Sequence, residues 1–306
     1  MIDWFEKVDI KLQVIIISSS TSIIVFVLGW IIRVFYERNS LKFRLKKEFE
    51  FEQKKKLKQD IAKNKIPLLN IAEELNYRLW NLNENIDKRW LKISKKEWEE
   101  ADKYYTRSFV YRFLVFIHWI LKTEKDTVSI DTTIADKNDI LFLKYIKTFK
   151  DIFSEPKLLK ELNYSNDTSS HHFFRNNLIG LSKIVVDNEK VLDFDEFKNK
   201  TKNKYNELNK VIKYFSEINN DNTDKNLNVL WCFHLIIISF LNKFGHTYQK
   251  TDKTKLKELT SIYKDKIKIK KGFENFVLKN KLEKELKYII RKINNESPTL
   301  HIHNGG

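Results

Sequence analysis

Two groups of side chains in this sequence are of the types that bind metal ions. His171 and His172 are adjacent, and Asp193, Asp195 and Glu196 form a second group farther along the chain. Imidazole nitrogens and carboxylate oxygens ligate transition metals when several of them converge on one point. The side chains of adjacent histidines usually diverge, and carboxylates at the start of a helix are explained by the helix dipole. We therefore expect no metal and no cofactor, with His171 and His172 as the metal candidates.

A second pattern pairs an arginine with a histidine. Arg112 and His118 stand in "YRFLVFIH" with five residues between them. This spacing resembles the catalytic motif of the all-helical HEPN ribonucleases, in which motif residues of two protomers face one cleft and the histidine acts on the ribose 2′-hydroxyl. The sequence departs from that motif at Phe113, where a polar residue is usual, and the other intervening residues are nearly all apolar. On one helix the two side chains also lie about 120° from alignment. The resemblance makes Arg112 and His118 catalytic candidates, whereas their surroundings predict polar side chains on a packed helix.

The composition predicts that helices position all of these side chains. The 306 residues include only three prolines and six glycines, too few for a strand-rich fold with many turns. The single cysteine excludes an internal disulfide framework and a multi-cysteine zinc site. We find no glycine-rich phosphate loop, Gly-x-Ser-x-Gly elbow or His-Glu-x-x-His motif. The expected fold is therefore all-α, and the common nucleotide-dependent and hydrolytic enzyme classes are disfavoured.

Apolar residues at spacings of three and four predict a pair of helices. Pro67 suits the first position of one helix, which carries the coiled-coil-like seam Leu68, Ala72, Leu75, Leu79, Leu82 and Ile86. Its expected partner is a helix over 98–122, antiparallel because the connection is short. Pairing between two copies of the chain is the alternative.

The remaining chain reads as further helices of an antiparallel bundle. Asp136 is a predicted N-cap, and Gly180 is expected to allow close packing. The expected helices cover 140–153, part of 171–186, 197–218, 229–241, 256–269 and 273–293. The run 229–241 is too short to span a bilayer and is predicted to be a core helix.

The stretch "VIIISSSTSIIVFVLGWII" (14–32) predicts a transmembrane helix. Nineteen helical residues extend roughly 28 Å, close to the hydrocarbon thickness. Twelve of them are Ile, Val, Leu or Phe, which favours insertion by roughly 4 to 7 kcal/mol. A strand hairpin is disfavoured because the central Ser and Thr residues include no turn former. Hydroxyls at these positions are expected to bond back to the i−4 carbonyl or to mark a helix contact.

The distribution of basic residues predicts the orientation of this helix. Lys7 and Lys11 precede the span, and a basic group follows it, consisting of Arg33, Arg38, Lys42, Arg44, Lys46 and Lys47. The positive-inside rule then places the N-terminus outside and the rest in the cytoplasm, in the inner (plasma) membrane. These six residues are the predicted contacts with anionic lipid headgroups. The formal charge of +16 also suits nucleic acid, although general lysine and asparagine enrichment explains it too.

These observations define five expected segments. They are an extracytoplasmic N-terminus (1–12), the transmembrane helix (13–36), a charged juxtamembrane helix (37–66), a cytoplasmic helical domain (67–293) and a flexible tail (294–306). The stretches 67–82, 111–125 and 173–186 resemble segments of uncharacterised bacterial helical proteins that carry one N-terminal membrane helix. That resemblance implies an α-helical fold and no particular chemistry.

Three functions fit this organisation. The first is a membrane-anchored, non-catalytic interaction or scaffold protein with an unidentified protein partner, or with a second copy of itself as partner. The second is a membrane-tethered nucleic-acid-binding protein or HEPN-like ribonuclease, which rests on the charge and on Arg112 and His118. The third is a stress or defence effector that perturbs the membrane. The apolar span and the heptad seam favour the first.

Overall fold

Most of the described residues of this protein lie in α-helices, as the composition predicts. The computed structural model describes residues 9–101, 103–127, 134–165 and 170–294, and its contacts divide the chain into two units, Met1–Lys56 and Leu57–Gly306. Helix α2 (Ile10–Asn85) begins in the first unit and ends in the second. Among the described residues, the only strands are the two of a short hairpin, β1 (Val186–Asp187) and β2 (Lys190–Val191).

The described part of the first unit is almost entirely the N-terminal part of α2, and its apolar side chains are exposed on every side. Between Val14 and Ile32 every side chain except Ile16 is exposed. The hydroxyls of Thr21 and Ser22 donate to the carbonyls of Ile17 and Ser18, at 2.8 and 2.9 Å, as expected for hydroxyl residues inside an apolar helix. By length and composition this part of α2 is a candidate membrane span.

In the second unit, the remaining part of α2 is a core helix. The predicted seam from Leu68 to Leu82 is buried, and Ile86 is buried in the 3-10 turn η1 (Ile86–Lys88). The helix does not begin at Pro67, because α2 continues through this residue. Proline removes one backbone donor, but burial of the leucine and isoleucine side chains that follow it compensates for that loss. Burial also starts earlier than expected, at Leu57.

Contacts between α2 and α4 (Tyr104–Thr127) confirm the antiparallel pairing within one chain. Asn64 bonds Asp126, Glu74 pairs with Arg112, and Arg78 covers Tyr104, so residue numbers rise along one helix as they fall along the other. The predicted 98–122 helix is interrupted, however, because the capped short helix α3 (Lys95–Glu100) precedes α4.

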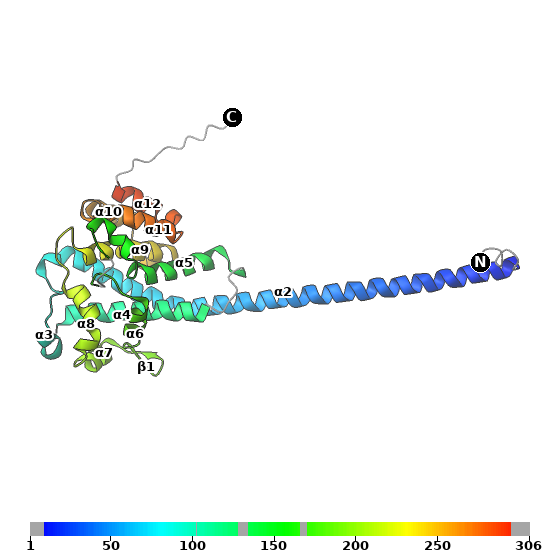
Figure 1. Cartoon of the computed structure of the whole chain (residues 1–306), viewed down its shortest axis with the longest axis horizontal. Coiled ribbons are helices and arrows are strands. Elements are labelled where there is room, and N and C mark those ends of the chain that lie inside the picture. Colours follow the sequence, from blue (N-terminus) through cyan, green and yellow to red (C-terminus); the bar gives the residue numbers. More distant parts are fainter. Residues whose placement is uncertain (1–8, 102, 128–133, 166–169, 295–306) are drawn as a thin grey trace, which may run out of the picture. The chain divides into compact units, whose positions relative to one another are not determined.

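The other elements that the structure describes in the second unit are α5 (Lys137–Ile152), η3 (Pro156–Leu162), α6 (Arg175–Ser182), α7 (Phe194–Thr201), α8 (Tyr205–Ser216), α9 (Lys225–Phe244), η4 (Thr247–Gln249), α10 (Lys253–Lys266), α11 (Lys270–Lys279) and α12 (Glu283–Asn294). Helices α4 and α9 organise these elements (Figure 1). Helix α4 contacts α5, α6, α7 and α8, whereas α9 contacts α5, α12 and the 3-10 helix η3. Helix α9 is long and apolar enough to span a bilayer but is buried in this unit, which confirms its predicted role as a core helix.

Phenylalanine rings connect these helices at the centre of the core. Phe113 of α4 contacts Phe153 and Phe215 at ring-centroid distances of 4.9 and 5.2 Å, and Phe153 contacts Phe233 of α9 at 4.8 Å. Buried aromatic pairs of this kind add about 0.5 to 1.5 kcal/mol each beyond the area they bury. The core therefore fixes α4, α8 and α9 relative to one another.

Two predicted helices are each divided in the structure. The 197–218 helix is α7 and α8, and the 273–293 helix is α11 and α12. The expectation that Gly180 allows close packing is wrong, because a side-chain carbon at that position would meet no atom within 4 Å. Gly180 faces solvent and serves no close packing.

Candidate functional site

Arg112, the first catalytic candidate, is part of an ion pair between α4 and α2. Its Nε lies 2.8 Å from Glu74 Oε2, and its Nη1 donates to the Ser108 carbonyl at 3.2 Å. The neighbouring Arg78 lies over the Tyr104 and Tyr105 rings, and its pKa is lowered by burial and then by Arg112. These contacts join the two helices, which is a structural use of both arginines.

His118, the second catalytic candidate, lies farther along α4. Burial, and then the charge of Lys122, lowers the pKa of His118. Its ring meets Trp119 edge to face at 5.5 Å. It is offset from Arg112 by six helical positions, which amounts to about 9 Å along the helix axis and a large rotation around it. Within one chain, the structure therefore does not bring the two candidates together.

The metal candidates His171 and His172 bind different neighbours. His171 Nδ1 lies 2.9 Å from Asn226 Oδ1, whereas His172 Nδ1 lies 2.8 Å from the Tyr164 hydroxyl. Asp193 caps α7, and Asp195 and Glu196 lie in its first turn, as expected for an acidic helix start. Within the described residues no three His, Cys, Asp or Glu side chains are grouped as a metal site requires.

The six predicted lipid contacts are exposed along α2. They are Arg33, Arg38, Lys42, Arg44, Lys46 and Lys47. Arg33 pairs with Glu37 and Lys47 with Glu50, each at 2.9 Å. Pairs this exposed are screened by solvent and hold the side chains only weakly. The six cations therefore remain accessible to an anionic surface.

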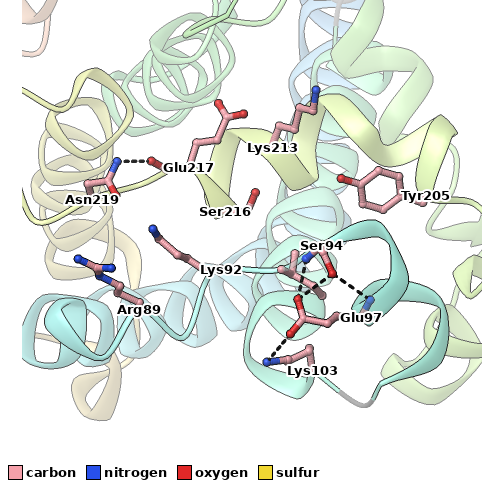
Figure 2. Close-up of a pocket in the computed structure, with 11 residues that line it drawn as sticks. Arg89, Lys92, Ser94, Glu97, Lys103, Tyr205, Lys213, Ser216, Glu217 and Asn219 are labelled. Atoms are coloured by element: carbon pink, nitrogen blue, oxygen red, sulfur yellow. Dashed lines mark hydrogen bonds and ion pairs between the residues drawn. The ribbon is translucent and has the colours of Figure 1, made fainter.

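A cleft that the sequence did not indicate lies between the loop before α3 and the C-terminal end of α8 (Figure 2). Its volume is about 700 Å³. The lining side chains are Arg89, Lys92, Ile93, Ser94, Glu97, Lys103, Tyr205, Lys213, Ser216, Glu217 and Asn219. We call it the α3–α8 cleft.

Hydrogen bonds hold both walls of the α3–α8 cleft in place. Thr106 Oγ1 donates to the carbonyls of Trp90 and Leu91, at 3.1 Å each, which fixes the loop that carries Arg89 and Lys92. Asn220 Nδ2 donates to Asp87 Oδ1 at 2.6 Å and joins the two walls. Because these bonds form within the folded chain, the cleft needs little rearrangement to receive a ligand.

The charges of the cleft are unevenly paired. Glu97 receives bonds from the Ser94 backbone and from Lys103, at 2.8 and 2.9 Å, and these bonds lower its pKa to about 2. Among the described residues, Arg89, Lys92 and Lys213 pair with no carboxylate. Figure 2 shows Lys213 and Glu217 extending from α8 away from the loop, whereas Lys92 extends from the loop into the space between the walls.

A sequence signal exists for one wall of this cleft, the loop before α3. The stretch "DKRWLKISKKEWEE" (87–100) combines a basic run with Ser94 and Glu97 at the spacing of a capping box, and a capped helix indicates a fixed loop before it. The opposite wall comes from α8, more than a hundred residues later, and no local pattern predicts that approach.

No known protein family, curated protein or solved structure matches this chain. Support for the site therefore comes from the residues of this chain alone. The resemblance to uncharacterised bacterial helical proteins with a membrane helix stays a prediction.

Proposed function

We propose that this chain is a single-pass membrane protein whose helical domain takes part in protein interactions on the cytoplasmic side. One observation carries the proposal: the exposed apolar surface of α2 between Val14 and Ile32. Soluble monomers rarely leave a continuous apolar surface of this size uncovered. A lipid bilayer covers such a surface at the length of helix that this stretch provides.

The positions of the polar candidates support an interaction role over catalysis. Arg112 pairs with Glu74, His171 meets Asn226, and His172 meets Tyr164. Each of these contacts joins two segments of the helical domain, so the side chains have structural partners. Cross-linking in native membranes followed by identification of the captured protein tests the interaction role, and a chain that captures no reproducible partner contradicts it.

Membrane anchoring is tested by alkaline carbonate extraction of the full-length protein. Two lysines in the middle of the span, Ile23→Lys with Val27→Lys, each cost about 2.5 to 3.5 kcal/mol of insertion free energy, which offsets the whole favourable term. We expect the wild type to stay with the membrane pellet and this variant to move to the supernatant.

A matched control places the same lysines outside the span. Leu41 and Leu45 are exposed on the same helix at the same spacing, so Leu41→Lys with Leu45→Lys adds equal charge. The control variant is expected to stay in the pellet. Release of the wild type, or equal behaviour of both variants, would refute the anchor.

The membrane-perturbing effector is a second proposal for the same span. It rests on the same exposed apolar surface of α2. Growth arrest on overexpression that is abolished by deleting residues 1–36 would favour it over a passive anchor. Normal growth with the full-length chain would contradict it.

A further inference from the structure

We infer that the α3–α8 cleft binds a small soluble anion that carries two or more phosphate charges and has the size of a nucleotide. This inference goes beyond the proposed anchor and interaction role and does not depend on them. It rests on three features of the cleft: its volume, its unpaired cations and its fixed walls.

The volume of the cleft matches a small molecule. Ligand sites in proteins typically enclose about 300 to 1,000 Å³, and this cleft has about 700 Å³. Figure 2 shows Arg89 and Lys92 on the loop wall, and Tyr205 on the opposite wall with Lys213 beside it. An anionic group bound by Arg89 and Lys92 would leave the rest of the molecule near Tyr205, whose hydroxyl can donate or accept a hydrogen bond.

The cations favour phosphate over a single carboxylate. The planar guanidinium of Arg89 is suited to bidentate bonds with phosphate oxygens, and the ammonium of Lys92 adds a second charge. Ser216 contributes a hydroxyl on the facing wall. Glu97 does not neutralise these cations, because the Ser94 backbone and Lys103 already occupy its carboxylate.

The backbone at Arg89 bears on the choice of variants. Arg89 has a φ of 54° and a ψ of 31°, and this left-handed conformation ends η1 with a bond from the Arg89 N–H to the Ile86 carbonyl. The conformation favours glycine or asparagine over arginine, so glycine at this position should not destabilise the fold.

The test is isothermal titration of ATP, without metal ions, into the full-length protein in phosphatidylcholine nanodiscs. We expect saturable binding that pyrophosphate displaces. Arg89→Gln with Lys92→Gln should weaken it at least tenfold. The matched control, Lys95→Gln with Lys96→Gln, removes the same charge from exposed residues outside the cleft and should change the affinity less than twofold.

A second variant separates binding from folding. Arg89→Gly removes the guanidinium and relieves the left-handed conformation, so the melting temperature should stay the same or rise while ATP binding falls tenfold. The absence of saturable binding to the wild type, or equal losses in both double variants, would overturn the inference.

Two further binding measurements identify which kind of molecule supplies the phosphate that binds the cleft. In nanodiscs that contain phosphatidylglycerol, the affinity for ATP should stay within threefold of its value in phosphatidylcholine nanodiscs. A tenfold or greater loss of ATP affinity would assign the cations to lipid headgroups. If a single-stranded RNA binds more tightly than ATP, and Arg89→Gln with Lys92→Gln abolishes that binding, the cleft is assigned to nucleic acid. Either result would overturn a soluble small-molecule ligand.

Discussion

At the scale of single residues, His234 shows how this fold uses a titratable group in its core. His234 is fully buried on α9, with its Nδ1 2.8 Å from the Tyr263 hydroxyl and its Nε2 3.0 Å from Asn76 Oδ1. Because the Asn76 oxygen only accepts, Nε2 carries the proton and Nδ1 accepts from the tyrosine. Both ring nitrogens of this core histidine are therefore hydrogen-bonded.

Burial makes His234 a source of acid sensitivity. Burial lowers the pKa of His234 to about 3, whereas an unfolded histidine titrates near 6.5. Between these values the unfolded state binds a proton that the folded state excludes, so stability falls as pH falls below about 6.5. From pH 7 to pH 5 this single group should lower the free energy of unfolding by about 2 kcal/mol.

The variant His234→Gln isolates this contribution. Glutamine does not titrate. Between pH 7 and pH 5 the free energy of unfolding of the variant should therefore fall by about 2 kcal/mol less than that of the wild type. Denaturant titration of the full-length proteins in detergent micelles measures both slopes. Identical pH dependence in the two proteins would show that His234 does not titrate as proposed.

Residue types predicted local roles well and long-range partners poorly. The cap at Asp136 and the acidic start of α7 were predictable because both depend on residues within one turn. The partner of Arg112 was not, because Glu74 lies on another helix and several carboxylates fit equally well by sequence. For the same reason the α3–α8 cleft could not be predicted from the sequence.

At the scale of elements, a tertiary hydrogen bond lies at each of the unpredicted helix breaks. Between α11 and α12, Lys281 adopts a φ of 56°, and its carbonyl accepts a bond from Lys144 of α5 at 3.2 Å. Between α7 and α8, the Thr201 carbonyl accepts a bond from the Trp98 indole at 3.0 Å. No glycine or proline marks either break, so periodicity alone predicts a continuous helix.

Two helical glycines provide an opposite pair of predictions at this scale. Gly180 lies in α6 with open space around it, so Gly180→Ala should stabilise the protein by about 0.5 to 1 kcal/mol through a better helix propensity. Gly272 lies in α11, where an added Cβ would come within 2.5 Å of the Leu158 carbonyl oxygen. Gly272→Ala should therefore destabilise it by about 1 to 3 kcal/mol.

Thermal unfolding of both alanine variants beside the wild type distinguishes the two environments. The melting temperature should rise for Gly180→Ala and fall for Gly272→Ala. A fall for Gly180→Ala would mean that α6 packs against something at this face, such as a partner protein that covers it.

At the scale of the whole molecule, the proposed anchor fixes which side of the membrane the helical domain occupies. Six basic residues lie between Arg33 and Lys47, directly after the apolar stretch, whereas only Lys7 and Lys11 precede it. The single natural cysteine, Cys232, is fully buried, so it provides a silent background for labelling.

The expected topology places an added cysteine in the cytoplasm. In intact cells a membrane-impermeant maleimide should not label Lys284→Cys, an exposed position at the start of α12, and should label it after lysis. The wild type should stay unlabelled in both states because Cys232 is inaccessible.

Charge reversal tests whether the basic group causes that topology. Replacing Arg33, Arg38, Lys42 and Arg44 with glutamate removes the excess of positive charge that keeps this side of the span in the cytoplasm. Part of the Lys284→Cys population should then become labelled in intact cells. The same four-residue change at Lys253, Lys255, Lys257 and Lys264 of α10 removes equal charge far from the span in sequence and should leave labelling unchanged. Labelling of Lys284→Cys in intact cells without any charge change would place the helical domain outside, and the proposed cytoplasmic role would fail with it.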